Sequence, residues 1–202
     1  MLDKDGFNEW APEYDSAVDR SRDAGEYPFC GYDDVHKRVF ERVKDAKDVI
    51  DFGVGTGRLT KRLYDRGANI VGVDFSENMI AAARKKMPNA SFVCADLTHG
   101  MPNIDRKFDA AIMLYAIHHL TDEQKISLIG GAGAHMKKGG IFVIGDVAFA
   151  DEKDRLYARD RAGDDWDDDE YYCVYENLKD RLGRSSSFEK VSFCAGVITI
   201  EF

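Results

Sequence analysis

The stretch VIDFGVGTGRLTKRL, residues 49–63, places three glycines at alternate positions between a short apolar run and an amphipathic segment. Glycine permits positive φ and lets a ligand approach the main chain, and the first N–H groups of a following helix lack partners within that helix. Val49, Ile50 and Phe52 predict a buried strand, and the pattern from Arg58 onward predicts a helix with one apolar face. A strand, a glycine turn and a helix in this order are typical of chains that bind nucleotide-like ligands at the carboxyl end of a parallel sheet.

The glycine spacing discriminates between ligands. Gly53, Gly55 and Gly57 form G-x-G-x-G, whereas the dinucleotide motif is G-x-G-x-x-G and the phosphate loop ends in Gly-Lys-Ser/Thr. Arg58 stands where the third dinucleotide glycine would be, and Asp51 adds an acid at the end of the strand. A carboxylate there repels a phosphate and suits a ligand that carries an ammonium group.

Several motifs together resemble those of the class I S-adenosylmethionine (SAM) dependent methyltransferases, in order and at suitable spacing. They are VIDFGVGTG, VGVDFSENMIAAAR, CADLTHGMP, FDAAIMLYAIHHLTDEQK and MKKGGIFVIGD. The resemblance covers roughly residues 7–146 and points to compact bacterial small-molecule methyltransferases. It implies SAM as cofactor, S-adenosylhomocysteine (SAH) as its product, and a small-molecule methyl acceptor.

Apolar and amphipathic segments alternate along the chain. The expected strands lie near residues 48–52, 69–74, 91–94, 108–115 and 140–147, and the expected helices near 57–66, 76–86 and 121–137. Such alternation predicts an α/β fold with a mainly parallel sheet covered on both faces. The resemblance makes this a Rossmann-like sheet of seven strands that closes with an antiparallel C-terminal pair.

We expect the 202 residues to form a single methyltransferase domain with three parts. These are an N-terminal helical lid (1–45), a SAM-binding core (46–147), and C-terminal helices with the closing strand pair (148–202). The chain after Asp151 is expected to be helical to about Leu182. The two closing strands are expected to join at Gly196.

The N-terminal segment carries an apolar stripe at helical spacing, formed by Phe7, Trp10, Tyr14 and Val18. Core packing is one explanation of this stripe. In the resembling methyltransferases, however, such a segment folds over the cofactor. On that basis we expect ligand to protect residues 3–30, with Tyr14, Phe29 and Tyr32 at the mouth of the active site.

A second strand ends in Asp74, 19 residues after Gly55. A carboxylate there, facing ligand or solvent, can accept hydrogen bonds from both ribose hydroxyls of an adenosine. The alternative is that Asp74 only caps the helix that begins near Ser76, although Ser76 can cap that helix itself. Phe75 and Met79 belong either to the wall of the adenine pocket or to the core.

A third strand is followed by Asp96. The resemblance implies that Asp96 accepts from the adenine amino group while the backbone near Leu97 addresses a ring nitrogen. The alternative is an ordinary turn-forming aspartate. If these assignments hold, three acids lie at one edge of the sheet.

The fourth strand leads into MLYAIHHLTDEQK. Leu114 and the residues from Tyr115 to His119 are expected beside the methionine part of the cofactor and its reactive methyl group. His118 and His119 are candidates for a catalytic base, or they orient the loop before the helix cap at Thr121. We expect no metal site, because adjacent side chains should diverge and a third ligand is not recognisable from spacing.

The segment DDWDDDEYY, from Asp164 to Tyr172, concentrates acidic residues. Acidic runs are typical of a solvated loop and of a helix start, where acids complement the helix dipole. The alternative is a rim that attracts a cationic substrate and contacts it through aromatic side chains. Those side chains would be Trp166, Tyr171, Tyr172 or Tyr175.

The overall charge bears on the partners. A net charge of -9 disfavours the electrostatic attraction on which nucleic-acid binding depends, so a small-molecule partner is expected. A charged start and the lack of a long apolar run predict a cytoplasmic protein without a membrane anchor. Four widely spaced cysteines (Cys30, Cys94, Cys173 and Cys194) are expected to be reduced core residues. Monomer and homodimer both remain open.

Two other functions are compatible with parts of the pattern. A module that holds SAM or SAH without turnover would carry the same cofactor motifs, because these motifs report binding rather than activity. A nicotinamide-dependent oxidoreductase is disfavoured by Arg58 and Asp51. The motifs leave the acceptor and its attacked atom open.

Overall fold

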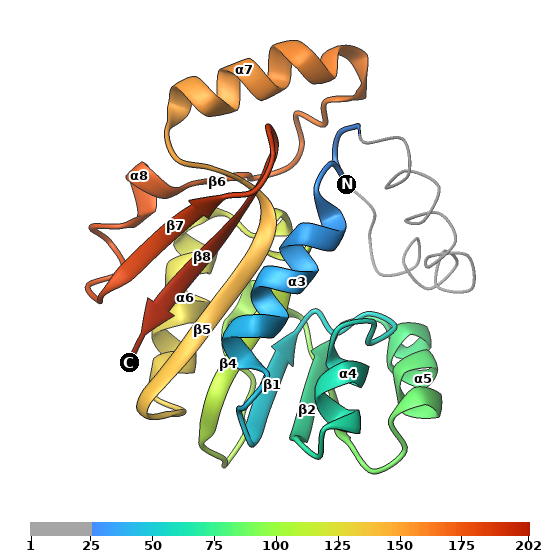
Figure 1. The fold of residues 1–202 in the computed structure, drawn as a ribbon. Helices are drawn as coiled ribbons and strands as arrows, with labels where there is room; N and C mark the ends of the chain where they lie inside the picture. Colours follow the sequence, from blue (N-terminus) through green and yellow to red (C-terminus); the bar gives the residue numbers. More distant parts are fainter. Residues whose placement is uncertain (1–25) are drawn as a thin grey trace.

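The computed structural model describes residues 26–202, so Tyr14 and the expected helical segment before residue 26 lie outside the described range. Within this range the strands form one mixed sheet (Figure 1). They are β1 (Asp48–Phe52), β2 (Asn69–Asp74), β3 (Ser91–Cys94), β4 (Phe108–Leu114), β5 (Met136–Phe149), β6 (Cys173–Val174), β7 (Ser186–Lys190) and β8 (Ala195–Glu201). Their order is β3-β2-β1-β4-β5-β8-β7, and β6 pairs with β5 off this path.

The strand directions confirm the predicted fold class. Strands β1 to β5 are parallel to their neighbours, whereas β8 is antiparallel to β5 and β7 is antiparallel to β8. The chain runs outward from β1 to β3 and then returns to place β4 on the other side of β1. The carboxyl ends of β1 and β4 therefore flank a switch point, which is where open α/β sheets bind ligands.

Helices cover both faces of the sheet, as predicted. On one face lie α3 (Tyr32–Val43), α4 (Thr60–Asp65) and α5 (Glu77–Lys86), and on the other lies α6 (Asp122–Gly133) (Figure 1). Successive strand residues alternate between the two layers, so Val49 packs with the first group of helices and Ile50 with the second. The predicted cap of α6 is confirmed, because Thr121 and Gln124 form a reciprocal capping box.

Several predicted boundaries are wrong. The helix expected from residue 57 begins at Thr60, and the helix expected to end at 137 ends at Gly133. β5 consequently starts at Met136 and continues to Phe149, across the part boundary expected at residue 147. The strand predicted at residues 140–147 is too short, because Lys137 to Gly140 lack the apolar character that predicts a strand.

The C-terminal region also differs from its prediction. Helix α7 (Glu152–Ala162) ends early, α8 (Tyr175–Leu178) is one turn long, and no helix begins within the acidic segment. Gly196 is not the turn between the last strands, because it pairs within β8 with Lys190 and Asp146. A Cβ at this position would lie 2.4 Å from the ring of Phe188, so close packing explains the glycine.

Two further expectations concern membrane-spanning helices and the cysteines. Among the helices of residues 26–202, none combines the length and the apolar character that a membrane crossing requires. Cys173 and Cys194 are buried and Cys30 is partly buried, all as free thiols. Cys94 is exposed rather than part of the core, because it ends the edge strand β3.

Candidate active site

The glycine turn after β1 has the backbone that its sequence predicted. Gly53, Gly55 and Gly57 have φ values of 71°, 51° and 77°, in the left-handed region. A Cβ on Gly53 would lie 2.6 Å from Ala116, and one on Gly57 would lie 2.6 Å from Met87. A Cβ on Gly55 would meet none of the described residues within 4 Å. Packing therefore requires a glycine at position 53, whereas the contact at Gly57 is with the flexible end of the Met87 side chain, and its positive φ is what favours glycine there. Gly55 leaves open space beside the main chain.

That open space belongs to a small cavity of about 40 Å³. The cavity lies at the switch point between β1 and β4. It is lined by Tyr32, His36, Asp51, Gly53, Val54, Gly55, Thr56, Arg58, Leu59, Thr60, Leu114 and Tyr115. The structure thus brings together five residues of the predicted cofactor site, Asp51, Gly53, Gly55, Leu114 and Tyr115, with Tyr32 of the predicted mouth.

Asp51 is an almost fully buried carboxyl at the floor of this cavity. The hydroxyl of Thr60 donates a hydrogen bond to it. Burial raises the pKa of Asp51 to about 7; the Thr60 bond opposes this rise and the nearby Asp74 adds to it. A cationic ligand group placed here would therefore meet an acid that ionises near neutral pH.

Asp74 is buried, so it does not face solvent; its contact with a ligand stays a prediction. Its carboxylate accepts hydrogen bonds from the backbone N–H groups of Gly55 at 2.8 Å and Ser76 at 2.9 Å. Burial raises its pKa and these donors lower it, with a net rise. The helix-cap alternative is not supported either, because Ser76 caps α5 by accepting from the N–H of Met79. Asp74 joins the glycine turn to the end of β2.

The remaining adenine-pocket residues do not line this cavity. Asp96 is exposed and caps the short 3-10 helix Leu97–His99 by accepting from Thr98, which is the geometry of the turn-forming alternative. Met79 is buried, and Phe75 and Leu97 are partly buried.

Aromatic side chains pack together where the chain leaves the end of β4. Tyr115 has a φ of 46°, and among the described non-glycine residues it is the one with a positive φ. Its ring stacks on Tyr32 with centroids 5.0 Å apart and lies 5.5 Å from Phe29. Phe29 and Tyr32 therefore do pack at the side of the cavity formed by Tyr115.

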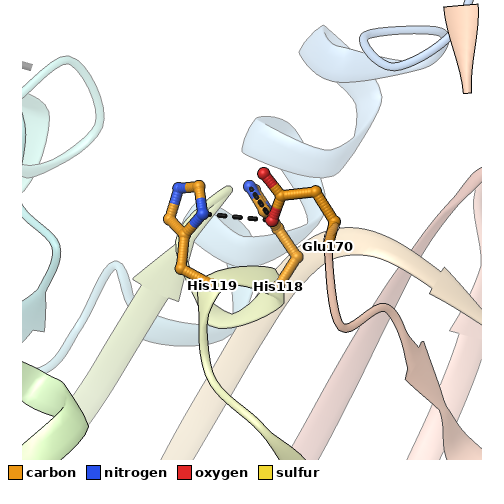
Figure 2. Close-up of side chains that lie close together, drawn as sticks. All are labelled: His118, His119 and Glu170. Carbon is orange, nitrogen blue, oxygen red and sulfur yellow. Dashed lines mark hydrogen bonds and ion pairs between the residues drawn. The ribbon is translucent and has the colours of Figure 1, made fainter. Parts of the chain in front are cut away.

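His118 and His119 converge instead of diverging (Figure 2). His118 Nδ1 donates to Asp146 Oδ1 at 2.6 Å, and its Nε2 lies 3.9 Å from Glu170 Oε2. His119 Nδ1 lies 3.1 Å from the same Glu170 oxygen. Burial lowers the pKa of His118, but the Asp146 carboxylate more than offsets this, so the pKa lies above its usual value. The expected divergence fails because a 3-10 turn, Ile117–His119, carries both side chains toward one carboxylate.

Asp146 was missed from the sequence. It lies inside β5, is fully buried, and also accepts from the N–H groups of Ala116 and Ile117 at 3.0 Å. A lone acid within the apolar run IFVIGDVAF was the available signal, because a buried carboxylate requires partners.

The acidic segment is only partly solvated. Asp164, Asp165, Asp168 and Asp169 are exposed, as the solvated-loop interpretation predicted. Glu170 instead turns inward to the histidines (Figure 2). The buried amine of Lys125 on α6 donates to the carbonyl of Tyr171 and so holds the acidic segment against α6.

Two aromatic residues of this segment also pack inward. Trp166 and Tyr172 lie 4.6 Å apart between ring centroids, and each also contacts Tyr27 and Phe149. Tyr172 lies 6.4 Å from the His118 ring. The segment therefore forms a wall beside the histidines.

Comparison with known proteins agrees with this architecture. A methyltransferase domain model matches residues 49–140. An uncharacterized methyltransferase of Oceanobacillus iheyensis is 36% identical over 145 residues, which cover 72% of this chain and 67% of that protein. Another, from Geobacillus kaustophilus, is 32% identical over 194 residues, covering 91% and 89%.

Solved structures share the fold. DesVI of Streptomyces venezuelae superposes with a TM-score of 0.70 at 16% identity, over 99% of this chain and 98% of DesVI. A DhpI–SAM–HEP complex superposes with a TM-score of 0.69 at 24% identity, over 96% and 93%. The structures establish the fold and the sequence relatives establish the family: this chain belongs to the methyltransferases.

Proposed function

We propose that this methyltransferase binds SAM in the cavity over Gly55 and transfers its methyl group to a small-molecule acceptor by in-line displacement. The observation that carries the proposal is the open space beside Gly55 in a left-handed turn at the switch point of the sheet. The similarly folded DhpI, solved in complex with SAH and in complex with SAM and HEP, supports the choice of ligand.

The residues of the cavity fit such a ligand. Asp51 would meet the ammonium group, and Gly55 would give the main chain access to the methionine part. Asp74 does not line the cavity but bonds to the N–H of Gly55, and from there it would address the ribose. Leu114 and Tyr115 would border the reactive methyl group. The other predicted contacts, Gly53, Gly57, Phe75, Met79, Asp96, Leu97 and Tyr14, stay predictions.

SAM supplies an electrophilic methyl group, so the protein has chiefly to align the acceptor. Alignment of this kind can lower a barrier by ~7–11 kcal/mol. A base is needed only where the attacking atom must lose a proton. His118 and His119 are the predicted candidates for that role. Of the alternatives, the nicotinamide oxidoreductase gains no support from a chain of the methyltransferase family.

We expect SAM and SAH to raise the melting temperature, while NAD and ATP leave it unchanged. A ligand at ~100 times its dissociation constant adds ~2.7 kcal/mol to the free energy of unfolding. Thermal melts should follow removal of copurified ligand by unfolding and refolding. Melts that neither compound shifts at saturation would refute the cofactor assignment. Turnover of SAM across an acceptor panel then separates an enzyme from a module that only binds.

Asp74→Ala is expected to weaken SAH binding by roughly tenfold to a hundredfold, since a hydrogen bond to a charged group is worth ~1.5–3 kcal/mol. It should also lower the free energy of unfolding, because the N–H groups of Gly55 and Ser76 lose their acceptor. Calorimetric titration and urea unfolding measure the two effects.

Asp109→Ala is the matched control. Asp109 likewise accepts from two backbone N–H groups, those of Lys47 and Asp48, but at the opposite end of the sheet. The Asp109→Ala variant should lose stability and keep its affinity for SAH. Equal affinities for SAH in Asp74→Ala and the parent would remove the ribose assignment.

A further inference from the structure

We propose that His118, His119 and Glu170 bind a divalent transition-metal ion such as Zn²⁺. The site would use two imidazole nitrogens and one carboxylate oxygen, presented by the 3-10 turn Ile117–His119 and by the acidic segment. It goes beyond the proposed function, and metal binding can be tested with no SAM present.

The three side chains already form a cluster. Their ligand atoms all lie within 4.8 Å of one another, and all three residues are partly buried. Two histidines and one carboxylate are the donor set of many catalytic zinc sites and of mononuclear iron sites. Ligand atoms ~2.0–2.2 Å from one tetrahedral ion are about 3.3–3.6 Å apart. The two separations between a histidine nitrogen and the Glu170 oxygen, 3.1 Å and 3.9 Å, bracket that value. The two imidazole nitrogens lie within 4.8 Å of each other, so metal binding would require side-chain rotations that adjust their separation.

Asp146 prepares one of these ligands. It accepts the Nδ1 proton of His118, so the lone pair of that imidazole is at Nε2, on the side of Glu170. Asp146 is itself fully buried and held by the N–H groups of Ala116 and Ile117. A carboxylate behind a ligating histidine is the usual outer shell of a metal site, where it sets the tautomer and the ring orientation.

The charge of the cluster favours a cation. Two carboxylates, Asp146 and Glu170, face the two imidazoles, and the side chain of Glu170 is 11% exposed. The nearby buried amine of Lys125 is engaged elsewhere, with Asp122 and the carbonyl of Tyr171. A divalent ion would balance both carboxylates without protonation of the histidines.

Metal binding and base catalysis exclude each other at these residues. The imidazole lone pair that would take a proton from an acceptor is the same pair that would bind the ion. Imidazole ligands also select the class of ion, because they suit Zn²⁺, Co²⁺ and Fe²⁺ better than Mg²⁺ or Ca²⁺.

The test is a Co²⁺ titration of chelator-treated, tag-free protein, followed by visible absorption, with Zn²⁺ as competitor. We expect one Co²⁺ per chain, ligand-field bands of a low-coordinate site, and displacement by Zn²⁺ but not by Mg²⁺. Glu170→Gln and His119→Ala should each weaken Co²⁺ binding at least tenfold. Asp168→Asn, an exposed acid of the same segment, and His135→Ala, a histidine outside the cluster, should bind like the parent.

The parent titration is decisive even if a variant folds poorly. No saturable Co²⁺ binding by the parent, or binding that Glu170→Gln and His119→Ala leave unchanged while circular dichroism reports a native fold, would overturn the proposal. Displacement of Co²⁺ by Mg²⁺ would overturn it too. SAH binding measured on the same samples separates the two conclusions, since its retention leaves the cofactor site intact when the metal site fails.

Discussion

Gly55→Val is expected to abolish SAH binding while the protein still folds. The valine side chain would occupy the open space beside the main chain, where no other residue of the described range 26–202 lies within 4 Å of a Cβ, its chain neighbours aside. It would also be held at φ 51°, which costs ~1–2 kcal/mol for a residue with a Cβ. Calorimetric titration with SAH should give no measurable heat of binding, and circular dichroism should report a native fold.

Gly67→Val is the control for backbone strain. Gly67 has φ 86° and lies in the turn after α4, outside the cavity, and its Cβ would also meet none of the described residues within 4 Å. Both variants should lose a similar free energy of unfolding, yet only Gly55→Val should lose the ligand. If Gly55→Val retains the affinity of the parent, the cofactor does not lie over the glycine turn.

Asp51→Asn is expected to make the unliganded protein more stable above neutral pH and to weaken SAM binding. The pKa of Asp51 is raised from 3.8 to about 7 in the folded protein. The folded state therefore holds a proton between about pH 4 and 7 that the unfolded state releases, and stability falls as pH rises through this window. At about 1.4 kcal/mol for each pKa unit, the asparagine should gain roughly 1–4 kcal/mol at pH 8.

Binding should change in the opposite direction. The asparagine keeps an acceptor for the Thr60 hydroxyl but has no charge for the ligand ammonium, so SAM affinity should fall at least tenfold.

The contrasting variant is Asp109→Asn. The pKa of Asp109 lies below its usual value, because hydrogen bonds from Asp48 and Lys137 outweigh the effect of burial. Its replacement should destabilise the protein at pH 8. Urea unfolding from pH 4 to 8 and calorimetric titration distinguish these outcomes, and an Asp51→Asn variant less stable than the parent at pH 8 would contradict the assigned shift.

Local pattern was sufficient for the elements that carry the cofactor site. The glycine turn was predictable because three alternate glycines between a strand and a helix permit few backbone conformations. The five strands of the parallel part followed from apolar runs separated by amphipathic segments. The resemblance to methyltransferases supplied what periodicity could not, namely the antiparallel end of the sheet.

Partners from distant parts of the chain were not predictable in this way. Glu170 reaches His119 across 51 residues, and Asp146 reaches His118 across 28 residues. In sequence the first is one acid among six and the second a lone acid in an apolar strand. The prediction that Gly196 is a turn between strands is wrong for a related reason. The ring of Phe188, which requires a glycine at this position, lies on the neighbouring strand.

The hydrogen bond from Gly55 to Asp74 has a consequence for ligand association. It fastens the turn after β1 to the end of β2 within the protein itself, so the turn needs no ligand to hold its shape. The conformational entropy of these residues is therefore lost during folding and not during association. A preorganised site of this kind converts more of each contact into affinity than a loop that must order around its ligand.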